Sequence, residues 1–373
     1  MLDKMDAAAP DTLSHLLSHG FIPPLISALE VVGPSSPEQP SGITFPIAIG
    51  ALKSLLCKGV GYPWVEQALR VGLLNQIVSW GSKRGTNAED LEMELLENVL
   101  PQRLVYYSVI LQMKKAFADV RSPSSDGKFT RAELYGPWNK LKALLDERST
   151  VLEGWEAKGR PSFMVCYNLE CGMVTAHRNE FERCSGCLTA TYCSDTCQRA
   201  DWTAGHRQDC RLHLDARRGF VHMGVHHRDR AFLRHLLRMD YLRLRLPIAI
   251  DMVRFMAENP DVRLAVHFDY TRRSTRVQVF PFSTLEGSKI LAAHSQRFAL
   301  VSGRLVAHTL HIDCGSGTFR TLWPLWASTS EFYDGLKDIA RTAKGLEDAE
   351  LEPRVSELIQ KTTGNGLKEL CYC

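Results

Sequence analysis

Residues 166–210 read CYNLECGMVTAHRNEFERCSGCLTATYCSDTCQRADWTAGHRQDC, and this stretch decides how the middle of the chain folds. It holds seven of the 11 cysteines of the 373-residue chain, against about one expected from uniform scatter. Clustered thiols in a chain without a secretory signal indicate metal binding rather than disulfides. An odd number of thiols also fits a closed disulfide framework poorly. We therefore expect a metal-stabilised module in this stretch.

The spacing of the ligand-type side chains favours zinc. Short spacers separate Cys166, Cys171, Cys184, Cys187, Cys193, Cys197, His206 and Cys210. Eight ligands are enough for two tetrahedral zinc ions. A short loop with a glycine lets Cys184 and Cys187 bind one ion. Cys193 and Cys197 are four residues apart, as are His206 and Cys210, so each pair would share a helix face. Spacing alone leaves open which pairs combine.

At this point the stretch resembles the MYND zinc finger family. Beyond the ligands, it shares the family's Tyr192-Cys193-Ser194 and the run Cys197–Trp202. The resemblance implies two interleaved sites. The first ligand set would be Cys166, Cys171, Cys193 and Cys197, and the second Cys184, Cys187, His206 and Cys210. One departure is the four-residue spacer after Cys166, where a two-residue spacer is commoner; we expect a longer first loop with zinc binding intact.

Both implied sites are closed, which is typical of structural rather than catalytic zinc. A finger this small has almost no apolar core of its own, so we expect zinc binding to supply most of its folding free energy. The formal charge of the chain is +3. Seven thiolates and two Zn²⁺ together lower that charge to about zero. Nucleic acid is therefore not the partner that the charge favours.

Fingers of this family bind other proteins, and the resemblance implies that short proline-containing peptides dock beside the second helix. The residues that match that surface are Gln198 and Trp202. An indole can stack on a proline ring while an amide bonds the peptide backbone. The alternative is that Trp202 only covers the zinc cluster while Gln198 is solvated.

Residues 1–160 indicate a helical domain, because apolar residues recur there at spacings of three and four. Gly20–Ile26 and Gly72–Val78 each place a glycine directly before an apolar helix. This resembles the turn of armadillo-type repeats, in which stacked helices share one core. An irregular helical bundle is the alternative.

Residues 211–373 change in character. A helix-like segment over Ala231–Glu258 precedes alternating, β-like runs at 263–270, 276–282, 298–311 and 318–325, and two helices close the chain. We expect a mainly α fold with an α+β C-terminal region, whose function the sequence does not indicate. The domains would be 1–160, 166–210 and 211–373.

Two other functions remain as alternatives to an adaptor. Some SET-type, S-adenosylmethionine-dependent lysine methyltransferases carry this finger as an insertion, but their flanking Asn-His-Ser and Gly-Glu-Glu-Leu segments have no match here. A basic nucleic-acid-associated regulator would use Arg228, Arg230 and Arg234. The ordinary interpretation of those arginines is that they form a basic surface exposed to solvent. We find no catalytic constellation and expect a protein that is not an enzyme.

The location of the protein follows from its N-terminus and hydropathy. Met1–Asp6 is acidic and is followed by no apolar segment of the signal-peptide type. No apolar run approaches the ~18 residues of a membrane span. We expect an intracellular protein of the cytoplasm or nucleus. The sequence thus predicts a zinc-binding adaptor that acts through protein partners.

Overall fold

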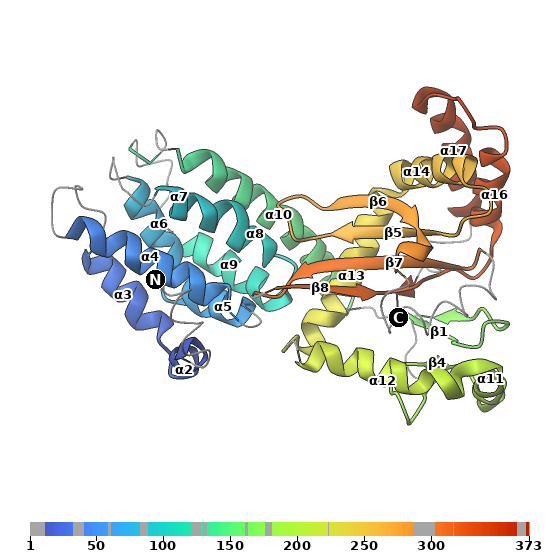
Figure 1. Ribbon diagram of the computed structural model, residues 1–373, viewed down its shortest axis with the longest axis horizontal. Coiled ribbons are helices and arrows are strands. Elements are labelled where there is room, and N and C mark those ends of the chain that lie inside the picture. The colour runs from blue at the N-terminus through green and yellow to red at the C-terminus, as the bar shows by residue number, and fades with distance from the viewer. Residues whose placement is uncertain are drawn as a thin grey trace.

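Figure 1 shows the computed structural model, with a helical region at one end and a sheet region at the other. It describes residues 12–32, 41–58, 61–82, 89–120, 128–129, 133–160, 163–175, 181–222, 224–285, 303–315, 317–363 and 371–372. The predicted fold class, a mainly helical chain with an α+β C-terminal region, is confirmed. The N-terminal residues behind the prediction about a signal peptide lie outside these ranges. None of the helices in these ranges is both long and apolar enough to cross a bilayer.

The N-terminal region is built from helices that pack against one another (Figure 1). Their bounds are α2 Thr12–Ser18, α3 Ile22–Val32, α4 Ser41–Leu56, α5 Tyr62–Arg70, α6 Leu73–Gly81, α7 Glu89–Glu94, the π-helical turn η1 Leu95–Val99, α8 Leu100–Gln102, α9 Tyr107–Asp119 and α10 Tyr135–Ala157. The apolar positions that predicted α3, among them Ile22, Ile26 and Leu29, are buried. They form one stripe on the helix because they are spaced by three and four residues.

The two glycine turns predicted from the sequence are present. Gly20 precedes α3 with φ +71°, and Gly72 precedes α6 with φ +95°. Only glycine adopts such angles without a steric cost, and it therefore lets each helix start abruptly after the one before. The stacking of these helices into an armadillo-like array stays a prediction.

The C-terminal region is a sheet with helices. Its helices are α12 Arg207–His222, α13 His227–Arg243, α14 Arg245–Glu258, the 3₁₀ turn η6 Phe282–Leu285, α16 Glu331–Ala340 and α17 Asp348–Thr363. Its strands are β5 Leu264–Asp269, β6 Arg276–Pro281, β7 Leu305–Asp313, β8 Thr318–Leu322, β9 Leu325–Trp326 and β10 Cys371–Tyr372. The strand order is β10-β9-β7-β5-β6, with β8 also paired to β7. The β5–β7 pair is parallel and the others are antiparallel.

The helical segment expected over Ala231–Glu258 is two helices, since α13 ends at Arg243, α14 begins at Arg245, and Leu244 between them caps both. Pro247 lies in the first turn of α14. Proline has no backbone N–H to continue a helix from the preceding turn, but it is tolerated in a first turn. The break therefore falls where the sequence permits a new helix to start.

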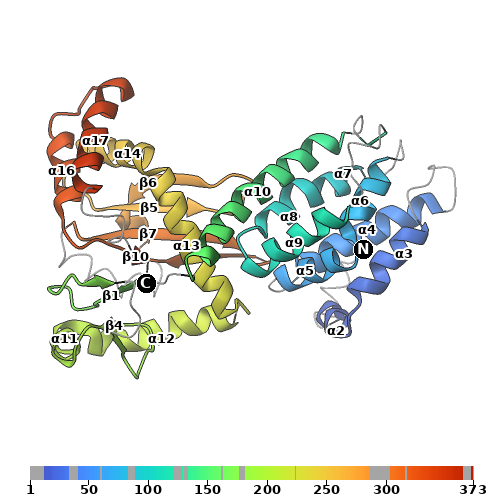
Figure 2. The same cartoon turned by 180° about the vertical axis from the view of Figure 1, so that it is seen from behind.

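Different parts of the protein pack against the two faces of the sheet. Helices α13 and α14 lie over one face (Figure 2), where Phe232 and Leu236 share a core with Val266. The finger lies against the other face, where Tyr192 shares a second core with Trp326. The expectation that the finger has almost no apolar core is therefore incomplete, because the sheet completes one for it.

Arginines of α13 join the parts of the molecule through aromatic rings. The guanidinium of Arg228 lies 5.3 Å from the ring of Tyr107 in α9, and that of Arg234 lies 5.6 Å from Trp323, beside β9. Arg238 lies 4.4 Å from Phe163, which leads into the finger. Cation–π contacts of this kind stabilise packing. Two of the three arginines named for a nucleic-acid interface thus make internal contacts.

Candidate metal centre

The finger consists of two small hairpins and a helix. Strands β1 Met164–Val165 and β2 Val174–Thr175 pair in the first hairpin, and β3 Glu182–Arg183 and β4 Thr191–Tyr192 pair in the second. Helix α11 Asp195–Asp201 and the π-helical turn η5 Trp202–His206 then lead into α12. Cys166, Cys184 and Cys193 each come directly after a strand. The short strands therefore position three of the eight ligand-type residues.

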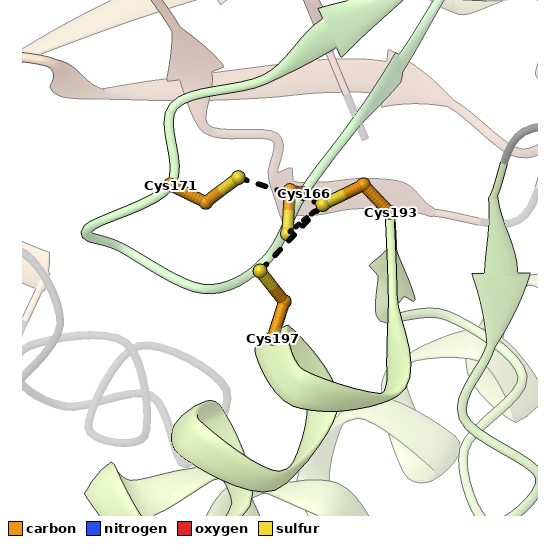
Figure 3. Close-up of side chains that lie close together, drawn as sticks. All are labelled: Cys166, Cys171, Cys193 and Cys197. Carbon is orange, nitrogen blue, oxygen red and sulfur yellow. Dashed lines mark hydrogen bonds between the residues drawn. The ribbon is translucent and has the colours of Figure 1, made fainter.

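The four sulfurs of the first ligand set converge (Figure 3). The Sγ atom of Cys193 lies 3.5 Å from that of Cys171, 3.7 Å from that of Cys166 and 3.5 Å from that of Cys197. A tetrahedral zinc ion with Zn–S bonds of about 2.3 Å requires sulfurs about 3.8 Å apart. The separations therefore fit a tetrahedral Cys₄ zinc site.

The second ligand set converges in the same way, with all four ligand atoms within 4.8 Å of one another. The Sγ atoms of Cys184 and Cys210 are 3.8 Å apart, and Sγ of Cys187 lies 3.7 Å from Nε2 of His206. A Cβ atom on Gly186 would lie 2.9 Å from Sγ of Cys210. Glycine is thus required in this loop to let the helix bring its cysteine close. These atoms fit a Cys₃His zinc site, and the pairing is the interleaved one that the MYND resemblance implied.

One detail of the sequence prediction is wrong. Cys193 was expected to share a helix face with Cys197, but it precedes the helix, whose N-cap is Ser194. The Ser194 hydroxyl accepts a hydrogen bond from the backbone N–H of Cys197, at 3.3 Å. Serine is a favoured N-cap residue, and the helix therefore begins at Asp195, two residues after Cys193. His206 and Cys210 do lie on helical turns, at the end of η5 and in α12.

The thiols differ in their protonation. A hydrogen bond from the Asn168 side chain lowers the pKa of Cys197 to about 7. Burial raises the pKa of Cys210 to about 12. Zinc binds the thiolate form and displaces these protons, so metal affinity rises with pH.

The finger contains a buried polar contact that its spacing pattern does not reveal. The Tyr192 hydroxyl donates a hydrogen bond to Oδ2 of Asp201, at 2.7 Å, and both side chains are buried. The contact ties β4 to the end of α11, and so holds the strand that precedes Cys193 against the helix that carries Cys197. In the sequence, the signal for this contact is the presence of Tyr192 in the Tyr-Cys-Ser segment and of Asp201 in the Ala-Asp-Trp segment.

The longer first loop has a partner in the C-terminal sheet region. Nη1 of Arg304 donates to the carbonyl of Leu169, at 3.0 Å, and its Nε donates to the carbonyl of Ala327, at 3.4 Å. A Cβ atom on Gly172 would lie 2.5 Å from Nη2 of Arg304. The first loop therefore receives an arginine from the sheet region. The spacing of the cysteines indicates the long loop but not Arg304 as its partner.

Gln198 lies in α11, and Trp202 is the first residue of the π-helical turn η5 that follows it. They are four residues apart, a spacing that places side chains on one helix face. The Trp202 ring centroid lies 5.8 Å from that of His206, and 40% of the residue is exposed. Trp202 therefore packs beside a ligand-type residue of the second set and is also partly exposed to solvent. The docking of a peptide on Gln198 and Trp202 stays a prediction.

Comparison with known proteins identifies the same stretch. The model of the MYND finger family matches residues 166–210. Two F-box proteins of Arabidopsis thaliana are 41% identical over 46 residues, or 12% of each chain, and 36% identical over 63 residues, or 16% of this chain and 19% of the relative. Ubiquitin carboxyl-terminal hydrolase 19 of Arabidopsis thaliana is 34% identical over 58 residues, which cover 16% of this chain and 8% of that protein.

Each match thus spans less than a fifth of the relative's length. No solved structure matches the chain. The matched family and the two converging ligand sets agree on the same residues. The chain therefore contains a MYND-type zinc finger at residues 166–210, a protein-interaction module with two structural zinc sites.

Proposed function

We propose that the protein is a non-enzymatic adaptor whose MYND finger docks short proline-containing segments of partner proteins against Gln198 and Trp202. The observation that carries this proposal is that Trp202 is 40% exposed while its ring packs beside the buried ring of His206. A large aromatic side chain that is already packed against a buried ring but still partly exposed loses little conformational entropy on binding. Such residues dominate the binding energy of many interfaces.

The proposed zinc ligands divide into the two sets described above. Cys166, Cys171, Cys193 and Cys197 would hold one ion, and Cys184, Cys187, His206 and Cys210 the other. Every coordination position of each tetrahedral ion would be filled by protein, which leaves none for water or substrate. The ions would act as scaffold for the helix that carries the docking residues, and the finger would perform no chemistry.

The proposed recognition combines stacking with one polar contact. A proline ring would stack on the Trp202 indole, and the Gln198 amide one turn earlier would hydrogen-bond the peptide backbone. A proline-containing segment is already extended and pays little entropy when it docks on an aromatic surface. The spacing of four residues places the two side chains on one face, as this mode requires.

The relatives support a transferable module. F-box proteins and a ubiquitin carboxyl-terminal hydrolase are different kinds of protein, and the similarity is confined to 46–63 residues that this chain also has. A segment that recurs in such different settings is expected to supply binding rather than a shared reaction. Their own activities do not transfer to this chain on so short a match.

The test is a Trp202→Ala variant of the full chain, measured by fluorescence anisotropy against a panel of labelled proline-containing decapeptides. We expect Kd to rise at least tenfold for every peptide that the unchanged protein binds, since loss of a stacked tryptophan costs about 2 kcal/mol or more. Gln198→Ala should weaken binding less, because it removes one hydrogen bond.

The matched control is Met173→Ala. Met173 is another exposed apolar residue of the finger, 47% exposed, but lies in the first hairpin. Both variants should retain two equivalents of zinc, which shows that the finger is still folded. Unchanged affinity of Trp202→Ala, or an equal loss in Met173→Ala, would contradict the proposed docking surface.

A further inference from the structure

A second recess lies away from the residues proposed for peptide docking on the finger. It is a groove of about 600 Å³ between the end of α14, the start of β7 and helix α16. Ligand sites in proteins commonly have volumes of 300–1,000 Å³. Its floor contains apolar side chains from three elements, among them Met256, Leu264 and Val306. The finger contributes none of the described residues that line it.

The groove is strongly basic. Arg263, Lys337, Arg341 and Lys344 line it, against Asp261 as the one carboxylate among its described lining residues. The chain as a whole has nearly balanced charges, 45 basic against 42 acidic residues. Four cations around one recess are therefore a local feature that attracts negative charge.

The cations are only partly neutralised by their neighbours. Arg341 pairs with Asp338 at 2.6 Å, but both side chains are exposed, and such pairs are weak. The Lys337 ammonium lies 4.9 Å from the ring centroid of Tyr333, which also lines the groove. Arg263 and Lys344 have no ion-pair partner within the described part of the chain. The groove thus offers positive charge beside an aromatic ring.

The arrangement of charge and apolar surface restricts the ligand. Arg263, Arg341 and Lys344 are exposed at the rim, and Val262 beside them is 41% exposed. A small molecule usually buries most of its surface in a closed pocket, which this open groove is not. An extended peptide alternates its side chains between two directions. Apolar side chains could therefore reach the floor while acidic ones meet the rim.

We propose that this groove binds an acidic peptide segment of a partner protein, in which glutamate or aspartate alternates with apolar residues. Binding here is independent of the finger and gives the adaptor a second contact. Arg263 and Lys337 lie on different elements, the loop before β5 and helix α16, and would contact the segment from both sides.

The experiment uses the full chain and a fluorescein-labelled decapeptide in which glutamate alternates with leucine. The test variant is Arg263→Gln with Lys337→Gln. The control variant is Lys140→Gln with Lys142→Gln, which removes the same charge from two exposed positions on α10. We expect the affinity of the test variant to fall at least fivefold and that of the control to stay within twofold. Raising the salt concentration should weaken binding by the unchanged protein.

Two further ligands test which features of the peptide are responsible for its binding. A peptide in which glutamate alternates with serine should bind at least fivefold more weakly, because the apolar floor is then not used. Inorganic phosphate at millimolar concentration should not displace the glutamate–leucine peptide beyond the effect of equal ionic strength. The proposal is overturned if the peptide fails to bind, if the control loses as much affinity as the test variant, if the serine peptide binds equally, or if phosphate displaces the peptide.

Discussion

Cys193 lies at the centre of the first ligand set, with its Sγ atom within 3.7 Å of the three other sulfurs. It sits between a buried strand and a capped helix, so its position is determined by backbone structure on both sides. A thiolate there would contribute charge and a soft donor atom to zinc. A serine hydroxyl offers neither at neutral pH.

We therefore expect Cys193→Ser to lower the zinc content from two to about one equivalent, since the second ligand set shares no residue with the first. Elemental analysis of protein purified without chelators measures this directly. The control is Cys57→Ser, which changes a half-buried thiol outside both ligand sets and should retain two equivalents. Loss of both ions, or of neither, would contradict two separate closed sites.

A second prediction for a single residue concerns His308 and the pH dependence of stability. It lies in β7, fully buried, with its ring centroid 5.2 Å from that of Tyr241, and burial lowers its pKa to about 3. An unfolded histidine has a pKa near 6.5. Below that pH the unfolded chain binds a proton that the folded chain does not bind until about pH 3. The contribution of His308 to stability is thus complete above about pH 6.5 and declines as the pH falls toward 3.

We expect His308→Gln to flatten the pH dependence of unfolding. Between pH 7 and pH 5.5 the unchanged protein should lose about 1 kcal/mol more of its free energy of unfolding than the variant does. Urea titrations at the two pH values measure the difference. Release of zinc by acid affects both proteins alike and cancels in the comparison. Parallel pH profiles would show that His308 is not the residue responsible.

At the scale of the elements, the first finger loop and the sheet region are joined by Arg304. Its guanidinium donates one hydrogen bond to the carbonyl of Leu169 in the finger loop and another to the carbonyl of Ala327 within the sheet region, so the first of these crosses from the sheet region to the finger. Gly172 lets the guanidinium approach the loop, and its φ of +67° is a second reason for glycine there. The loop after Cys166 is therefore part of the contact between finger and sheet.

We expect Gly172→Ala to destabilise the protein more than Gly159→Ala does. Gly159 has a similar φ of +71°, but a Cβ atom there would meet nothing within 4 Å. Both changes carry a backbone cost of about 1 kcal/mol. Only the first also displaces Arg304, at an added cost of about 1 kcal/mol for hydrogen bonds from a charged group. Thermal unfolding of the two variants checks this, and equal losses would contradict the role of Arg304.

At the scale of the whole molecule, a buried ion pair connects the N-terminal helices to the sheet region. Oδ2 of Asp240 in α13 accepts hydrogen bonds from Arg148 of α10, at 2.9 Å, and from the hydroxyl of Tyr270, at 2.7 Å. Arg148 also donates to Thr275, at 2.8 Å. Burial alone would lower the pKa of Arg148, but the Asp240 carboxylate raises it overall. The pair therefore keeps its charge although it lies between three elements.

We expect Asp240→Ala to lower the free energy of unfolding by about 3–5 kcal/mol, because it leaves the Arg148 guanidinium buried without its carboxylate. Denaturant titration measures the loss. The double change Arg148→Met with Asp240→Leu should recover most of it, since an apolar pair needs no counter-charge. A loss below about 1 kcal/mol in the single variant would mean that water replaces the carboxylate at this junction.

The order of elements was largely predictable from the sequence because its causes are local. The apolar spacing that indicated α3 and the alternation that indicated β5 depend on residues a few positions apart. Gly20 and Gly72 precede helices, as expected. The division of α13 from α14 at Leu244 was missed because Pro247 is compatible both with a kinked helix and with a new helix start.

The sequence by itself indicated the eight ligand-type residues, because zinc requires a particular number and kind of donors at short spacing. Their division into two sets was implied by the MYND resemblance and not by the spacing, and the structure brings the same two sets of side chains together. The sequence could not determine what the finger packs against. Trp326 and Arg304 come more than 90 residues after the finger, and no local rule connects them to Tyr192 or Leu169. Nor could it show that four cations from two distant segments surround one groove. Those relations arise only when burial of apolar surface brings remote segments together, and only the tertiary structure decided them.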